Sequence, residues 1–380
     1  LRRNPLRMLP PGFSLQPADG SIPRSLLNLG TPTTGLTDAA AAITVAMVVP
    51  PGVSMKFSSV IGNEGVAHVL RRAVDTGRVA PTILFHGRDG VGKKTMAMAF
   101  VSYLLCRDRR DGDSCGICSN CRSMDEGRYV DLEILEPDKG VIKIDAVRDA
   151  MPRLQYQPVI GPWKVLVIDD AHAMNTEAAN AALKSLEEPP AGTLFILITS
   201  SPDTLPRTVL SRSFQIPFGP VPTSAIIELL VSARGIEPDV AACAAAMCSG
   251  CPGQAFRLLD SQALAERRDF IKAFLSLVDQ PDRVRLQFSD GVPVDRDGGD
   301  VYRLILESVA RDLLAVVSGV SLDDLSNGDM KDELVAFAHK AGPDRVLAIA
   351  EAWLDWDAAR AYYPAPKNAI DRMVLGMPQR

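Results

Sequence analysis

Four cysteines in a short stretch carry the clearest chemical signal. Their spacing is Cys-x8-Cys-x2-Cys-x2-Cys, formed by Cys106, Cys115, Cys118 and Cys121. Four thiolates can surround Zn²⁺ as a tetrahedron, and the glycines at 112 and 116 suit tight turns. No histidine lies nearby, and four thiolates leave no open position for a reacting water. We therefore predict a structural Zn²⁺ site, with unrelated free thiols as the alternative.

A glycine-rich loop is the second signal. Apolar residues 82–86 lead into Gly-Arg-Asp-Gly-Val-Gly-Lys-Lys-Thr at 87–95, and a helical pattern follows. Glycines let backbone N–H groups approach phosphate oxygens, a lysine adds positive charge, and the start of a helix adds its dipole. The pattern predicts a phosphate site rather than an ordinary turn, and its candidate residues are Gly87, Gly90, Gly92, Lys93 and Thr95.

One position departs from a phosphate loop that hydrolyses ATP. Such a loop has Ser or Thr directly after the lysine, where the hydroxyl binds Mg²⁺. Here Lys94 stands at that position, and Thr95 comes one residue later. A cationic side chain opposes Mg²⁺ binding, so we do not expect hydrolysis. Whether the loop binds ATP stays open.

Polar residues also end two of the apolar runs that we expect to be strands. Asp169 and Asp170 follow the run at 164–168, where an acidic pair suits Mg²⁺ binding and water activation in phosphate-loop enzymes. The alternative for Asp170 is a polar strand end that caps the next helix. Thr199 ends the run at 193–199 and is a candidate for sensing a γ-phosphate.

Arg212 is a candidate arginine finger. Its planar, always charged guanidinium suits a phosphate in a neighbouring subunit, and the alternative is a solvated surface arginine. The remaining cysteines, Cys243, Cys248 and Cys251, favour buried helix thiols, and their role is left open.

Composition narrows the class of protein. The 380 residues predict two or three domains, and 47% hydrophobic with 23% charged residues is typical of a soluble globular protein. The net charge of -5 disfavours a generally basic nucleic-acid coat. The chain shows neither a membrane-spanning apolar run nor the pattern of a signal peptide, which favours a cytoplasmic location with no membrane partner. In that reducing setting we expect thiols or metal ligands, not disulfides.

Hydrophobic periodicity predicts an α/β fold that gives way to an all-α one. Strand candidates are 82–86, 132–135, 164–169 and 193–199, and helical patterns such as 94–105 and 175–188 lie between them. The helices expected after residue 218 lie at 224–232, 238–248, 253–259, 263–277, 300–317, 330–340 and 345–361. The expected domains are a disordered tail or mis-assigned gene start (1–54), an α/β domain (55–218), a lid (219–260) and an oligomerisation domain (261–380).

In their order along the chain, these motifs resemble the clamp-loader subunits of bacterial DNA polymerase III, of the AAA+ class. The resemblance rests on the loop, the cysteine cluster and the segments Lys164–His172, Asn180–Pro190 and Leu205–Arg212. It covers about residues 56–260. It implies an AAA+ phosphate-loop domain with a parallel sheet and an inserted zinc module at 106–121, a small three-helix lid, and a C-terminal helical collar.

Two subunit types of that family stay open. The tau/gamma subunit is the ATPase motor, and its loop reads Gly-Lys-Thr. The delta-prime subunit has a degraded nucleotide site and lends an arginine finger, and Lys94 favours this type. So does Gly253, which aligns with the motor's sensor arginine.

The resemblance implies a hetero-oligomer that loads the sliding clamp onto primer-template DNA during DNA replication. The partners are tau/gamma subunits, which bind the ATP, and a delta subunit. Arg212 then acts in trans.

A stand-alone zinc-containing DNA-binding module is a further alternative. It is disfavoured because acidic residues interleave with the arginines near the cluster and no aromatic residue lies in 106–121.

Overall fold

The computed structural model describes residues 55–138, 140–261, 263–292, 298–359 and 366–377. The expected tail at 1–54 and the end of the expected helix at 345–361 lie outside these residues. The described chain forms two compact units, of which the first ends at Arg257 and the second begins at Leu258. The expected domain bounds stay a prediction.

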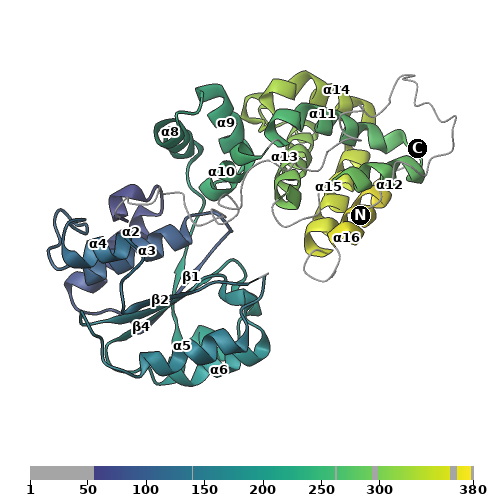
Figure 1. The fold of residues 1–380 in the computed structure, drawn as a ribbon. Helices are drawn as coiled ribbons and strands as arrows, with labels where there is room; N and C mark the ends of the chain where they lie inside the picture. Colours follow the sequence, from purple (N-terminus) through teal and green to yellow (C-terminus); the bar gives the residue numbers. More distant parts are fainter. Residues whose placement is uncertain (1–54, 139, 262, 293–297, 360–365, 378–380) are drawn as a thin grey trace, which may run out of the picture. The chain divides into compact units, whose positions relative to one another are not determined.

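The first unit is built on a sheet of five parallel strands in the order β2-β3-β4-β1-β5 (Figure 1). The strands are β1 (Thr82–His86), β2 (Leu132–Leu135), β3 (Lys164–Ile168), β4 (Thr193–Thr199) and β5 (Phe214–Pro217). The four strand candidates are confirmed, and the run at 164–169 ends one residue early. The sequence does not predict β5, because this edge strand buries only Ile216 and so lacks an apolar run.

Helices cover both faces of this sheet (Figure 1). One face carries α2 (Glu64–Asp75), α3 (Lys93–Leu105) and α4 (Ser119–Asp125), and the other carries α5 (Ile144–Leu154) and α6 (Thr176–Glu187). The short helix α7 (Arg207–Arg212) packs against α6. Because helices cover both faces, the central strands are continuous apolar runs, and every residue of β4 is buried.

Three short helices follow the sheet, as predicted. They are α8 (Thr223–Arg234), α9 (Pro238–Met247) and α10 (Pro252–Asp260), and α10 runs across the division between the two units. We call these three helices the lid. Cys248 and Cys251, between α9 and α10, are fully buried, and burial raises the pKa of Cys251 to about 11. Both thiols are buried as predicted but lie between helices, whereas Cys243 lies on α9 as predicted but is only half-buried.

The described residues of the second unit form helices and connecting loops, with no strand among them. Its helices are α11 (Ala263–Ser276), α12 (Asp282–Gly291), α13 (Gly298–Val317), α14 (Lys331–Ala341), α15 (Pro343–Ala359) and α16 (Pro366–Gly376). A buried arginine, Arg285 of α12, joins these elements: its guanidinium donates to the backbone oxygens of Leu277, Val278, Gln280 and Met377. No helix among the described residues is both long and apolar enough to cross a membrane.

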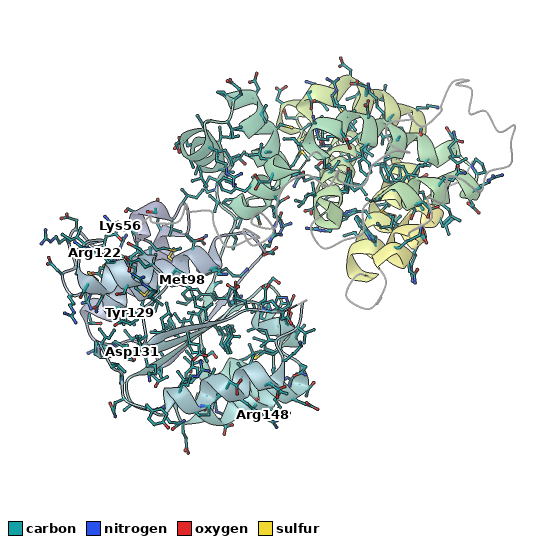
Figure 2. All side chains as sticks on the ribbon, viewed as in Figure 1. Lys56, Met98, Arg122, Tyr129, Asp131 and Arg148 are labelled. Atoms are coloured by element: carbon teal, nitrogen blue, oxygen red, sulfur yellow. The ribbon has the colours of Figure 1, made fainter. Side chains whose placement is uncertain are left out.

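At the amino ends of the strands, the buried carboxylate of Asp131 fixes the loop that follows α5. It lies beside the sheet (Figure 2) and accepts hydrogen bonds from the N–H groups of Val159 at 2.9 Å and Ile160 at 2.8 Å. The glycine-rich loop lies at the other end of the strands, directly after the carboxyl end of β1.

Candidate phosphate site and cysteine cluster

The carboxyl ends of three neighbouring strands bring the predicted phosphate-site residues together. In the sheet β1 pairs with β4 and β4 pairs with β3, and His86 at the end of β1 is in register with Thr199 at the end of β4. The glycine-rich loop follows β1, and Asp169 and Asp170 follow β3. The sequence could predict this meeting because parallel strands end at the same edge of a sheet.

Lys93, the first residue of α3, is held by the loop itself. Its side chain is buried, and its ammonium donates to the backbone oxygens of Gly87 at 2.7 Å and Arg88 at 2.8 Å. Gly90 and Gly92 have φ of +78° and +100°, which favour glycine. Burial lowers the pKa of Lys93 against the opposing charges of Asp89 and Asp170.

Lys94 contacts the acidic residues at this edge of the sheet. Its ammonium lies 3.0 Å from the Oδ2 atom of Asp169 and also donates to the Oε1 atom of Glu136. The other oxygen of Asp169 accepts the N–H of Asp170 at 3.1 Å, so both oxygens of this carboxylate are engaged. The sequence analysis missed Glu136. Glu136 directly follows β2, as Asp169 directly follows β3. This position at the end of a strand could have marked Glu136 as a candidate site residue.

The remaining predicted residues of the site have partners within the chain or lie beside it. The Thr199 hydroxyl is fully buried, lies 3.2 Å from the Nδ1 atom of His172, and accepts the N–H of Ser201 at 3.1 Å. Burial and the charge of Asp169 raise the pKa of Asp170, whose backbone has a left-handed φ of +48°. Thr95 is half-buried on α3.

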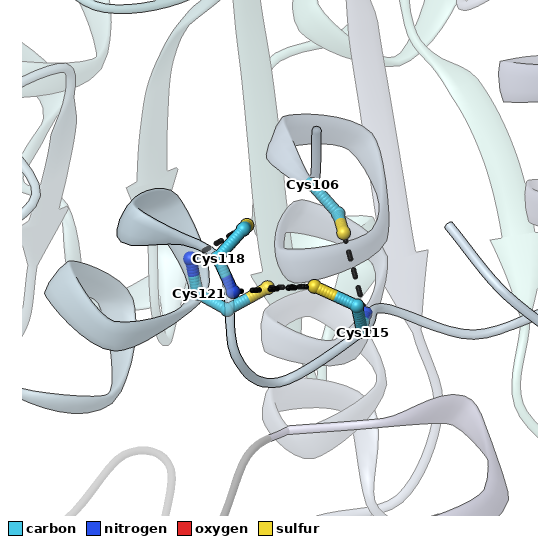
Figure 3. Close-up of side chains that lie close together, drawn as sticks. All are labelled: Cys106, Cys115, Cys118 and Cys121. Carbon is cyan, nitrogen blue, oxygen red and sulfur yellow. Dashed lines mark hydrogen bonds between the residues drawn. The ribbon is translucent and has the colours of Figure 1, made fainter. Parts of the chain in front are cut away.

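The four predicted metal ligands form one cluster (Figure 3). Cys106 ends α3, Cys115 lies in the following loop, and Cys118 and Cys121 begin α4. All four sulfur atoms lie within 4.8 Å of one another. Sulfurs bound to one tetrahedral Zn²⁺ at ~2.3 Å lie roughly 3.8 Å apart, so the cluster needs only a small contraction to hold the ion.

The backbone around the cluster favours thiolates. N–H groups of the chain point at the sulfurs, as in the bonds from Cys115 to Cys106 and from Cys118 to Cys115, both 3.3 Å long. Burial works against the charge on Cys118, but hydrogen bonds from the N–H groups of Arg107 and Cys121 lower the pKa of Cys118 to about 6. Burial raises the pKa of Cys106 and of Cys121, so binding a metal at the cluster must release the protons of those two thiols.

Comparison with known proteins decides the family. The chain is 32% identical over 275 residues to the DNA polymerase III subunit delta' of Escherichia coli K12, and the match covers 72% of this chain and 80% of that protein. The chain belongs to the clamp-loader subunits of DNA polymerase III, of the AAA+ class. A family model described as DNA polymerase III, delta subunit, matches residues 62–222 of this clamp-loader subunit.

Other relatives bear the tau name. The DNA polymerase III subunit tau of Salmonella typhimurium is 31% identical to this clamp-loader subunit over 303 residues, which are 75% of this chain and 46% of that protein. The chain thus spans about half the length of the first curated relatives that it matches. A solved gamma subunit-related protein from Thermotoga maritima aligns over 82% of this chain and 98% of its own, at 15% identity and a TM-score of 0.41.

Arg212 of this clamp-loader subunit lies at the amino ends of the parallel strands, whereas its own glycine-rich loop lies at their carboxyl ends. It ends α7 just before β5, and β5 runs parallel to β1, whose carboxyl end leads into the loop. Its guanidinium is 3.3 Å from the Oε1 atom of Glu187, and its side chain is 41% exposed. Because a strand length separates the two features, Arg212 cannot serve the phosphate site of its own chain.

The lid contacts the loop through backbone and side-chain groups of α10. The Gly253 N–H donates to the Gly90 backbone oxygen at 2.8 Å, and the Gln254 side-chain amide donates to the Asp89 backbone oxygen at 3.2 Å. Arg257 forms an ion pair of 2.8 Å with the Asp89 carboxylate. Burial alone would raise the pKa of Asp89, but Arg257 outweighs it and the pKa is lowered.

We expect Gly253→Ala to destabilise the first unit by about 1–3 kcal/mol, as overpacking does in other proteins. A Cβ atom at this residue would lie 2.9 Å from the Gly90 Cα atom, so the two backbones would have to separate and lose their hydrogen bond. Gly219→Ala is the matched control, because a Cβ atom there meets nothing within 4 Å. Denaturant unfolding of the full chain measures both. Equal unfolding midpoints for the two variants would contradict this prediction.

Proposed function

We propose that this chain is a delta-prime-like clamp-loader subunit that does not hydrolyse ATP. It joins tau/gamma and delta subunits in a hetero-oligomer, which opens the sliding clamp and places it on primer-template DNA in the cytoplasm. The observation that carries the proposal is the contact of Lys94 with Asp169. The side chain that stands where a motor has a Mg²⁺-binding hydroxyl is here an ammonium paired with the acidic residue of the site.

The family implies Mg²⁺ at this site, and the residues present do not fit it. A magnesium ion requires six oxygen ligands at ~2.1 Å. Here the Lys94 ammonium contacts the carboxylates of Asp169 and Glu136, and its positive charge repels a divalent cation. Both oxygens of Asp169 already have partners. The Thr199 hydroxyl, a candidate γ-phosphate sensor, is engaged by His172 and Ser201. These contacts favour the delta-prime type over a tau/gamma motor.

The proposed contribution of this subunit is its arginine. Phosphoryl transfer builds negative charge on the γ-phosphate oxygens, and a guanidinium from an adjacent subunit stabilises that charge. Arg212 is 41% exposed and lies away from the loop of its own chain, so it can reach a neighbour once its ion pair with Glu187 and its hydrogen bond to the Thr208 backbone oxygen are exchanged. The cysteine cluster is proposed to hold one structural Zn²⁺, because its four thiol groups leave no open coordination position.

The purified chain should hydrolyse no ATP, and it should co-purify with the tau/gamma and delta subunits. Release of phosphate from ATP is measured with and without primed DNA, beside the variant Lys93→Ala. The expected result is the same background rate for both proteins, because without Mg²⁺ the developing charge is not neutralised. Turnover that disappears in Lys93→Ala would show an active motor, and failure to bind the other subunits would overturn the clamp-loader role.

A further inference from the structure

Two carboxylates from different strands meet at a single ammonium. Asp169 follows β3 and Glu136 follows β2, two strands that lie side by side in the sheet. The Lys94 ammonium, from the first turn of α3, contacts both carboxylates. One side chain therefore joins the beginning of a helix to the ends of two strands, at the point where the family implies a divalent cation.

The surroundings of Lys94 suit a permanent charge. Its side chain is 30% exposed and the Asp169 side chain 18% exposed, so water screens their attraction only in part. Burial alone would lower the pKa of Lys94, but Asp169 and Glu136 outweigh it and the pKa is raised. Lys93 adds a second positive charge nearby, but its ammonium donates its hydrogen bonds to the backbone oxygens of Gly87 and Arg88.

We propose that Lys94 is a resident cation that takes the place of the divalent metal ion in this site. Its ammonium balances Asp169 and Glu136 and ties α3 to β2 and β3 without any bound metal. A covalently attached charge cannot dissociate, so this edge of the sheet keeps one arrangement whatever the concentration of divalent ions or nucleotide. The inference rests on the proposed function and deepens it, because it gives the acidic residues a role in a subunit without hydrolysis.

The test compares three variants of the full chain. Lys94→Thr introduces the hydroxyl that a motor has, Lys94→Met removes the charge and adds no ligand, and Lys143→Thr is the control. Lys143 also lies at the start of a helix and pairs with an aspartate, Asp138, at 3.2 Å, but its side chain is 64% exposed. Bound Mn²⁺ is counted by electron paramagnetic resonance, and the melting temperature is measured in EDTA and in Mn²⁺.

The unmodified chain and the control should bind no Mn²⁺ at this site and melt at the same temperature in both buffers. Lys94→Met should melt ~2–4 °C lower in both buffers. This is the shift that a loss of about 1 kcal/mol of unfolding free energy produces in a domain of roughly 200 residues. Lys94→Thr should melt lower in EDTA, bind one additional Mn²⁺ and recover most of its stability in Mn²⁺.

Two results would overturn the inference. They are Mn²⁺ binding by Lys94→Thr equal to that of the unmodified chain, or an unchanged melting temperature for Lys94→Met. Co-purification with the other subunits is measured separately. A chain that assembles but fails this test keeps its proposed function and loses only the resident cation.

Discussion

Cys121→Ser should reduce bound zinc from one equivalent per chain to a small fraction of that. Three thiolates and a hydroxyl hold Zn²⁺ far more weakly than four thiolates, and binding to a complete site releases ~10–16 kcal/mol in small zinc domains. The sulfur of Cys121 lies 3.9 Å from that of Cys115, close to the separation in a filled tetrahedral site. Elemental analysis of protein purified under reducing conditions, without chelators, measures the zinc.

Cys243→Ser is the control for zinc binding. This thiol is half-buried on α9 of the lid and lies outside the cluster, so the variant should keep its full equivalent of zinc. The loss in Cys121→Ser should loosen residues 106–121 but leave the sheet folded, because strands β1, β3 and β4 have their own buried core. Hydrogen exchange of these segments reports the difference. Unmodified, reduced chain that contains no zinc would contradict the prediction.

Arg212→Ala should leave the isolated chain folded and slow the assembled clamp loader. The lost ion pair with Glu187 joins two half-exposed side chains, and such pairs contribute at most ~1 kcal/mol. In the complex, loss of an arginine finger lowers the rate of the site that it serves by ~10³–10⁵. Under the role that we propose for Arg212, the motor site next to this chain would be the one to lose its finger, so the summed ATPase rate should fall partially. Clamp- and DNA-stimulated ATPase and the rate of clamp loading measure the effect.

Two further variants sharpen that experiment. Arg207→Ala removes an exposed arginine from the first position of the same helix and should leave the rates unchanged. Arg212→Lys should not restore them, because a point charge lacks the planar pair of N–H donors that bridges phosphate oxygens. Clamp loading at the unmodified rate by complexes that contain Arg212→Ala would show that this arginine is a surface residue.

The sequence alone determined the parts whose signal is local. Buried parallel strands are short apolar runs, so β1, β2, β3 and β4 were predicted from composition and length. The cysteine spacing predicted a cluster, because four ligands within sixteen residues can close around one ion without help from the rest of the chain. The glycine-rich loop and the acidic pair were each predicted at the end of an apolar run.

Only the tertiary structure decided how the charges at that edge are paired. Lys94 and Glu136 are 42 residues apart, and Asp89 and Arg257 are 168 apart, so no local pattern predicts either contact. The sequence placed a cation where Mg²⁺ binds in a motor, but it did not show that Asp169 and Glu136 would both reach this cation. These pairs depend on the order of strands in the sheet and on the packing of α10 against the loop, which arise only when distant segments bury their apolar surfaces together.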